Sequence, residues 1–271
     1  VMLLLALTCH SSWALGDKSW LANSARGNLV LVDQQRAIDI VLDRNELPGV
    51  QRAATHLQRD IHAVTGKQPA LNHQLAGQKQ LVLVGTLGNS ELIEQLIAHK
   101  KLDVSNIRNQ WDAFQVAVIE KPFADVERAL VIVGANKRGT MYGIYSLSEQ
   151  IGVSPWYWWA DVPVKKQSAL YIDKRLQLTE IPKVKYRGIF LNDEAPALTN
   201  WVAEKYGNYN AQFYEKVFEL LLRLKANFLW PAMWNNAFAD DDPQNAILAD
   251  EMGIVMSNSH HEPMMRADKE W

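Results

Sequence analysis

The sequence predicts an α/β protein in two parts: a mixed-sheet α/β domain, then parallel strands joined by helices, as in a barrel or an open α/β sheet. Up to residue 172, short apolar runs with the length of buried strands alternate with segments of helical periodicity. After residue 186, three apolar runs, separated by two helical patterns, each end in polar or aromatic residues. The stretch 165–183 is polar and contains Pro182, which is typical of a boundary. We therefore expect domains at 17–175 and 176–271.

The first 16 residues are predicted to be a signal peptide whose start is truncated. Residues 2–9 are apolar but too few to span a bilayer, and Ser12-Trp13-Ala14 has the small-x-small form of a cleavage site. The mature protein is then expected to be secreted or periplasmic. It would contain no disulfide, because Cys9 is the only cysteine. An apolar N-terminal strand is the alternative interpretation.

The elements of the first domain follow from apolar spacing and from residues that start and stop helices. Pro48 opens a helix that ends at Gly66, and Gly152 ends another. Helices are expected at 48–65, 90–100 and 140–151. Strands are expected at 29–32, 37–42, 81–84, 114–118, 130–133 and 169–172, the first two as a pair.

Lys137 and Arg138 lie in the stretch from Gly134 to Gly139, directly after a predicted strand. Two cations at the C-terminal end of a strand could hold an anion, so both are candidate substrate-binding residues. An ordinary tight turn is the alternative. The stretch lacks the full glycine fingerprint of a dinucleotide site, so this is not predicted to be a dinucleotide-binding fold.

The distribution of tryptophan favours a carbohydrate ligand. Seven of the ten tryptophans lie between Trp111 and Trp234, and a flat ring beside polar strand ends can stack on the apolar face of a sugar. The run Trp156-Tyr157-Trp158-Trp159 lies between prolines and cannot be a regular amphipathic helix. We expect most of it to pack as a wall between the domains; lining a sugar cleft is the other possibility.

The second part is expected to bring its polar residues to one edge. Strands are predicted at 188–191, 228–230 and 254–256, with helices at 213–224 and 243–252 between them. Parallel strands with crossover helices have their C-terminal ends on one edge, where barrels and open α/β sheets bind ligands. The residues expected to converge there are Asp193, Glu194, Trp230, Trp234, Asn235, His260 and His261.

Asn192-Asp193-Glu194 places two carboxyl groups at a strand end. Neighbouring residues of a strand point to opposite faces, so at most one of the two should face the site. Glycoside hydrolases need two carboxyls on opposite sides of the scissile bond, about 5–5.5 Å apart in retaining enzymes and about 6.5–9.5 Å apart in inverting ones. A catalytic partner for Asp193 must therefore come from elsewhere, and Glu149 of the first domain is one candidate. Asn192 is a candidate substrate-binding residue.

His260-His261-Glu262 does not have the His-Glu-x-x-His spacing of a zinc-protease helix, so neither a metal nor a cofactor is expected. A neutral imidazole that donates to a sugar hydroxyl, or an imidazolium that faces a carboxylate, fits these histidines better. Arg187 precedes its strand and should lie at the opposite edge. The net charge of −2 offers no basic face for nucleic acid.

Five strings of residues, taken in order, match a known family. They are Arg138–Tyr145, Ser154–Trp159, Tyr186–Glu194, Asn227–Trp234 and Ser257–Met264. In these strings the chain resembles glycoside hydrolase family 115, the xylan α-1,2-glucuronidases, and the resemblance covers most of residues 130–271.

The resemblance implies an N-terminal domain similar to the one that precedes the barrel in hexosaminidases, followed by a (β/α)8 barrel. Residues 176–271 would hold its first three β/α units. The implied activity is inverting hydrolysis of α-1,2-linked glucuronic acid, or its 4-O-methyl ether, from xylan, by a full-length protein that is often a homodimer. Asp193 would lie in the active site and Glu149 would reach it from the first domain. The uronic acid would contact His260 or His261, and Trp230 and Trp234 would shape the sugar pocket.

A closed barrel needs eight strands, and the family's general acid is expected beyond residue 271. The chain is therefore expected to be a fragment, truncated at both ends and inactive alone. One alternative is a β-N-acetylhexosaminidase-like hydrolase. Such an enzyme would be recognised by an Asp-Glu pair late in the barrel, in a region that this sequence does not contain. Another is a non-catalytic carbohydrate-binding protein. The Lys137-Arg138 pair and the two histidines favour an anionic sugar over a neutral one.

Overall fold

The computed structural model describes residues 19–257, and a six-stranded mixed sheet forms the centre of its first part. The strand order is β4-β3-β5-β7-β6-β9. The first four strands are parallel, whereas β6 is antiparallel to both of its neighbours. The strands are β3 (Asp39–Val41), β4 (Leu71–Asn72), β5 (Gln80–Thr86), β6 (Phe114–Glu120), β7 (Arg128–Gly134) and β9 (Gln177–Glu180).

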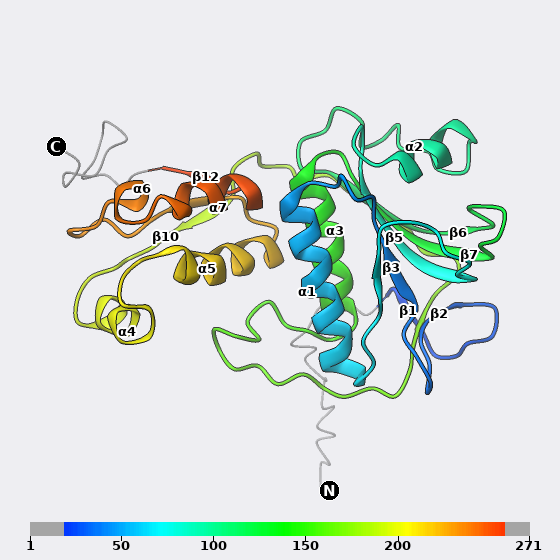
Figure 1. Cartoon of the computed structure of the whole chain (residues 1–271), viewed down its shortest axis with the longest axis horizontal. Coiled ribbons are helices and arrows are strands. Elements are labelled where there is room, and N and C mark those ends of the chain that lie inside the picture. Colours follow the sequence, from blue (N-terminus) through cyan, green and yellow to red (C-terminus); the bar gives the residue numbers. More distant parts are fainter. Residues whose placement is uncertain (1–18, 258–271) are drawn as a thin grey trace, which may run out of the picture.

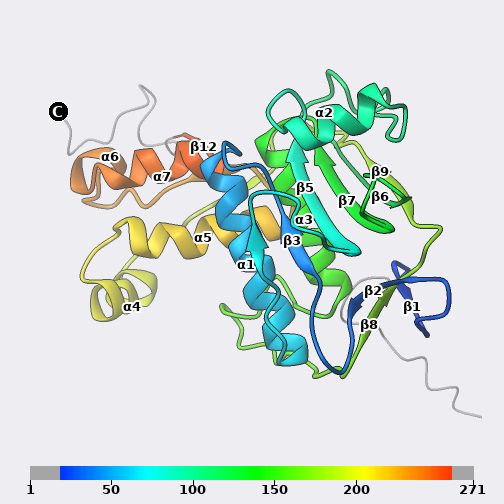
Figure 2. The same cartoon turned by 45° about the vertical axis from the view of Figure 1, so that its right-hand side comes forward.

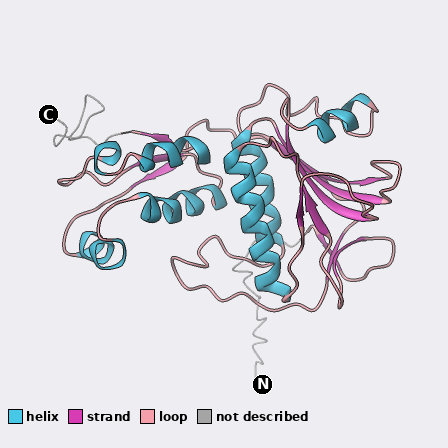
Figure 3. Ribbon diagram, viewed as in Figure 1, coloured by secondary structure: helices cyan, strands magenta, loops and turns pink. Residues whose placement is uncertain are grey.

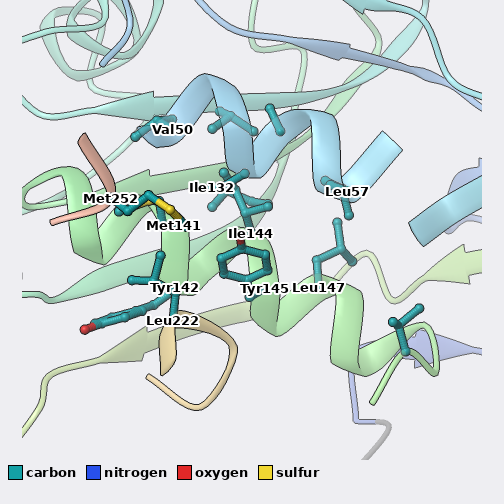
Figure 4. Packing of buried hydrophobic residues seen from close by; sticks show 14 of the residues in the cluster. Val50, Leu57, Ile132, Met141, Tyr142, Ile144, Tyr145, Leu147, Leu222 and Met252 are labelled. Atoms are coloured by element: carbon teal, nitrogen blue, oxygen red, sulfur yellow. The ribbon is translucent and has the colours of Figure 1, made fainter. Parts of the chain in front are cut away.

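Helices cover both faces of this sheet, which explains its continuous apolar strands. On one face α1 (Pro48–Thr65) and α3 (Lys137–Gln150) lie side by side, and α2 (Glu91–Ala98) covers the other (Figures 1 and 2). Along β7, Leu130 and Ile132 pack towards α1 and α3, while Val131 and Val133 join the cluster around α2. Figure 4 shows Ile132 among the side chains of the α1–α3 layer.

A small antiparallel sheet flanks the first part, in the order β1-β8-β2, and it corrects one prediction. Residues 29–32 and 37–42 do not form a pair: only Val32 and Ala37 make an isolated bridge. β2 pairs with β8, whereas β3 pairs with β4 and β5. Ile40 and Val41 are fully buried on opposite sides of β3, as only an inner strand of a covered sheet allows. The three strands are β1 (Leu21–Ala22), β2 (Leu29–Val32) and β8 (Leu170–Ile172).

The ends of α1 and α3 follow from local chemistry. Gly66 ends α1 in the left-handed conformation, with φ 73°, as predicted. α3 begins at Lys137 rather than at Thr140, because the side chain of Asn136 accepts a hydrogen bond from the N–H of Gly139 and caps the helix. Lys137 and Arg138 therefore lie in the first turn of α3.

The second part contains the predicted parallel strands in the order β10-β11-β12. A Cβ at Gly188, the first residue of β10, would lie 1.9 Å from the carbonyl oxygen of Phe228, so this close pairing requires glycine. Closure into a barrel stays a prediction. The strands are β10 (Gly188–Phe190), β11 (Phe228–Trp230) and β12 (Val255–Met256).

The helices of the second part include two that the sequence did not indicate. α5 (Ala211–Arg223) and α7 (Gln244–Met252) were predicted, but α4 (Ala197–Tyr206) and α6 (Phe238–Asp241) were not. α4 fully buries only Val202, although Leu198, Trp201 and Tyr206 at helical spacing also pack against the core, and α6 buries no residue. No helix within residues 19–257 has both the length and the apolarity needed to cross a bilayer.

The two parts share one hydrophobic core. The layer of α1 and α3 lies between the large sheet and the second part, and packs against α5 and α7 (Figure 3). Leu57 of α1, Tyr142 of α3 and Phe218 of α5 belong to the same buried cluster. β9 pairs with β6, so the first sheet continues to residue 180, past the boundary expected at 175.

The aromatic run after α3 packs against the second part, as expected for a wall between the domains. The indole N–H of Trp159 donates to the carbonyl of Lys216 at 3.1 Å, and its ring lies edge-on to Phe213. Trp158 and Trp159 both contact the ring of Trp201 in α4. These contacts hold residues 156–159, which follow α3, against α4 and α5.

Candidate functional site

The C-terminal edge of the parallel sheet carries most of the predicted site residues. β10 leads directly into Leu191-Asn192-Asp193, and β11 ends in Trp230 before a loop that reaches α6. Because β10 and β11 are parallel and in register, these segments leave the sheet on the same side. Six predicted residues lie at this edge: Asn192, Asp193, Glu194, Trp230, Trp234 and Asn235. His260 and His261 lie outside the described residues.

Asp193 is fully buried, with 0% of its surface exposed. Its Oδ2 accepts three hydrogen bonds: from the backbone N–H of Met233 at 3.1 Å, from that of Trp234 at 3.0 Å, and from Nδ2 of Asn236 at 3.0 Å. Its Oδ1 is also buried and has no donor within residues 19–257. Glu194 is exposed, and both carboxyls lie in the loop that follows the end of β10 at Phe190. The Asp193 carboxylate therefore binds the loop after β11.

The aromatic residues at this edge differ in exposure. Trp230 is half-buried with its ring 5.8 Å from that of Phe190, and its indole N–H has no acceptor among the described residues. Trp234 is 45% exposed and is followed by Asn235, also exposed, at a left-handed φ of 56°. Asn192 is exposed beside them. The Trp234 ring offers a surface on which the apolar face of a sugar can stack.

Lys137 and Arg138 lie at the opposite edge of the parallel sheet. Arg138 donates to the carbonyl of Gly253, which precedes β12, at 3.1 Å, and Lys137 donates to the carbonyl of Asp250. Arg138 also donates to Asp112 Oδ1 at 2.7 Å. Both side chains thus bind groups of the protein itself, and neither lies near Asp193.

The second predicted carboxyl belongs to the first part of the chain. Glu149 lies half-buried in the last turn of α3, which begins beside the N-terminal end of β12. No contact joins Glu149 to Asp193 within residues 19–257. No group of three or more potential metal ligands occurs in the same range.

Asp112 organises the N-terminal edge of the parallel sheet. It is fully buried, and its Oδ2 accepts from Asn227 Nδ2 at 2.8 Å and from Arg187 at 3.4 Å. Arg187 precedes β10 and Asn227 precedes β11, and they also bond to each other, Arg187 N–H to Asn227 Oδ1, at 2.9 Å. Arg187 was expected at this edge, which the structure confirms. Asp112 and Asn227 were not expected there.

A buried charged cluster joins α1 to α5. Arg223 donates to Asp60 at 2.8 Å and to Glu219 at 2.9 Å, and these three side chains are 2–4% exposed. Glu219 also accepts from Arg59 at 2.8 Å. Burial by itself raises the pKa of Glu219, but His56, Arg223 and Arg59 beside it lower that pKa to about 2. The sequence signal was present: Glu219 and Arg223 lie four apart on one face of α5, as do His56 and Asp60 on α1.

We expect this cluster to make stability depend on pH through His56. Burial, the largest cause, lowers the pKa of His56 from its ordinary 6.5 to about 4, while Glu219 opposes the shift. Between these values the unfolded chain binds a proton that the folded chain does not, so the free energy of unfolding falls as pH falls. The groups that face the imidazole are Arg52, Arg59, Tyr145, Glu219 and Arg223.

The fall should reach about 1 kcal/mol per pH unit within that window. Urea unfolding followed at pH 7.5, 6 and 5 measures it, and His56→Asn should flatten the slope. An equal slope in the variant and the parent would show that other groups set the pH dependence.

Solved structures with a similar fold include glycoside hydrolases. An N-acetyl-β-hexosaminidase of Streptomyces plicatus aligns with a TM-score of 0.51 at 9% identity, over 85% of this chain and 42% of its own, which shows a shared fold. The profile of the glycosyl hydrolase family 67 N-terminus matches residues 21–147. The first part of the chain is thus similar to the N-terminus of glycosyl hydrolase family 67.

The second part identifies the family. The profile of glycosyl hydrolase family 115 matches residues 179–271. BtGH115A, described as a family GH115 4-O-methyl-α-glucuronidase with specificity for decorated arabinogalactans, is 34% identical and aligns over 86% of this chain with a TM-score of 0.74. The chain belongs to glycoside hydrolase family 115. It spans 30% of the length of BtGH115A. No curated protein matches the sequence.

Proposed function

We propose that this chain forms the N-terminal domain and the first β/α units of an α-glucuronidase that removes glucuronic acid, or its 4-O-methyl ether, from polysaccharide branches. The likeness to BtGH115A, at 34% identity over 86% of this chain, carries this proposal. The exposed Trp234 ring at the C-terminal edge of the parallel sheet supports it, because such a ring suits a sugar. A secreted or periplasmic, dimeric enzyme is part of the proposal.

Hydrolysis with inversion requires water to attack the anomeric carbon on the side opposite to the leaving oxygen. A carboxylate takes the proton of the water while a carboxylic acid protonates the leaving oxygen. Glu149 stays a predicted partner carboxyl, because the two carboxyls of an inverting pair lie about 6.5–9.5 Å apart and need no contact with each other. His260 and His261 stay candidates for contact with the uronic acid.

Two polysaccharide backbones are candidates for the substrate that carries the uronic acid. The resemblance in the strings of the second part implies α-1,2-linked branches on xylan. BtGH115A has specificity for decorated arabinogalactans, which favours an arabinogalactan backbone as the second candidate. Both candidates present an α-linked uronic acid at a branch end, so they share the reaction and differ in what lies beyond the scissile bond.

The protein expressed from its complete reading frame is expected to release uronic acid from glucuronoxylan or from a uronic-acid-decorated arabinogalactan. Proton NMR in the first minutes should show the β-anomer, because inversion converts the α-linkage. An N-acetyl-β-hexosaminide is the control substrate. Release of N-acetylhexosamine without uronic acid would contradict the proposal, and early α-anomer would contradict inversion alone.

A further inference from the structure

The carboxylate of Asp193 holds a turn of the loop after β11. Two consecutive backbone N–H groups, of Met233 and Trp234, point at one oxygen of Asp193. Successive N–H groups that converge in this way form a concave site for an anion. The amide of Asn236 completes the set, since its Nδ2 donates both to this oxygen and to the carbonyl of Trp234 at 2.8 Å.

The turn depends on this anion for its shape. It reverses the chain through Asn235 at a left-handed φ of 56°, a conformation that asparagine tolerates better than most residues. The closing backbone hydrogen bond, from Asn236 N–H to the Met233 carbonyl, is long at 3.4 Å. Upstream, the N–H of Ala232 donates to the hydroxyl of Tyr214 in α5 at 3.2 Å. The closing hydrogen bond of the turn is weak and the bond from Ala232 lies upstream of it. We therefore infer that the three hydrogen bonds to Asp193 fix the conformation of residues 233–236.

The burial of Asp193 argues against its expected role as a base that activates water. A base must contact the water whose proton it takes. Atoms of residues 19–257 already enclose both carboxylate oxygens, and Oδ2 is occupied by three donors. Trp234, by contrast, leaves the same turn with 45% of its surface exposed. The group that solvent and a sugar can reach is therefore the ring, and the carboxylate lies behind it.

We propose that Asp193 is a positioning residue, which fixes the turn Met233–Asn236 and thereby presents the Trp234 ring to the sugar. This inference rests on the proposed function for its substrate, a uronic-acid-decorated oligosaccharide. Asp193 acts on substrate affinity through Trp234 and takes no proton in the reaction. Without the carboxylate, the N–H groups of Met233 and Trp234 lose their acceptor and the turn changes conformation. The Trp234 ring is then no longer held at the C-terminal edge of the parallel sheet.

The test compares Asp193→Asn, Asn236→Ala and Trp234→Ala in the protein from the complete reading frame. Asp193→Asn keeps one acceptor oxygen but loses the charge, and should raise KM about tenfold with kcat changed less than about threefold. Asn236→Ala, which removes one donor to the same oxygen, should raise KM in the same direction. In the Trp234→Ala background, Asp193→Asn should add little, because two residues that act through one contact are not additive.

The pH profile and the control separate positioning from proton transfer. The acid limb of kcat/KM should persist in Asp193→Asn, and Asp240→Asn, which removes an exposed carboxyl of α6 in the same segment, should leave KM unchanged. If Asp193→Asn abolished kcat and the acid limb at unchanged KM, while Asn236→Ala stayed active, Asp193 would be the base and the inference would fail.

Hydrogen exchange distinguishes this inference from the proposed function. In the protein from the complete reading frame, without substrate, the amides of Met233 and Trp234 should exchange at least about tenfold faster in Asp193→Asn than in the parent. This measurement needs no substrate, so it stands even where no uronic acid is released. Unchanged exchange at both amides would refute the positioning role whatever the enzyme hydrolyses.

Discussion

Replacing Arg223 with methionine is expected to lower the free energy of unfolding by about 4 kcal/mol. The guanidinium bonds to Asp60 at 2.8 Å and to Glu219 at 2.9 Å, and both carboxylates are almost fully buried. Methionine fills much of the same space but, within residues 19–257, leaves Asp60 with only Arg59, at 3.7 Å, as an ion-pair partner. A buried carboxylate without a matched cation destabilises the folded state strongly, and more than the intact pair stabilises it.

Urea unfolding at pH 7, followed by tryptophan fluorescence, measures this effect. The matched control is Arg175→Met, which removes an exposed arginine paired with Asp173 at the surface and should hardly move the midpoint. Equal shifts for the two variants would mean that the α1–α5 cluster contributes no more than a surface ion pair. Because Arg223 links the two parts of the chain, its replacement should also broaden the unfolding transition.

Asp112→Asn is expected to destabilise the protein by about 3 kcal/mol. Asparagine suits the left-handed φ of 55° at this position, so the backbone is preserved. The variant loses the ion pairs to Arg138 and Arg187. It also turns an amide donor towards groups that are themselves donors, including Asn227 Nδ2.

Asp161→Asn provides the comparison, because Asp161 also has a left-handed φ, 48°, but lies exposed. Its free energy of unfolding should change by less than about 0.5 kcal/mol. Hydrogen exchange should further show that the amides of Arg187 and Phe228, where β10 and β11 begin, lose protection in Asp112→Asn alone. Retained protection there would show that strand pairing holds this edge without Asp112.

Local periodicity was enough to predict the order of elements around the site. The apolar runs before Asn192 and after Asn227, with a helical pattern between them, predicted two parallel strands whose C-terminal ends share an edge, and β10 and β11 are paired in that way. These predictions succeeded because each depends on residues close together in the sequence.

The partners of the polar side chains could not be predicted in the same way. Lys137 and Arg138 were expected in a turn that holds an anion, but the cap at Asn136 starts α3 earlier and directs them to Asp250 and Asp112. The bonds between Asp193 and the loop after β11 depend on the direction of two backbone N–H groups. That direction follows from the turn at Asn235, and side-chain spacing does not encode it.

The contact between α1 and α5 has a consequence for synthesis on the ribosome. Asp60 and Arg223, which pair across it, are 163 residues apart in the chain. At about 5–20 residues per second, α1 leaves the ribosome roughly ten to thirty seconds before α5 can cover it. During that interval Arg52, Arg59 and Asp60 of α1 lack their partners Glu215, Glu219 and Arg223 in α5. The nascent first domain therefore exposes a charged side of α1 to solvent until residue 223 has emerged.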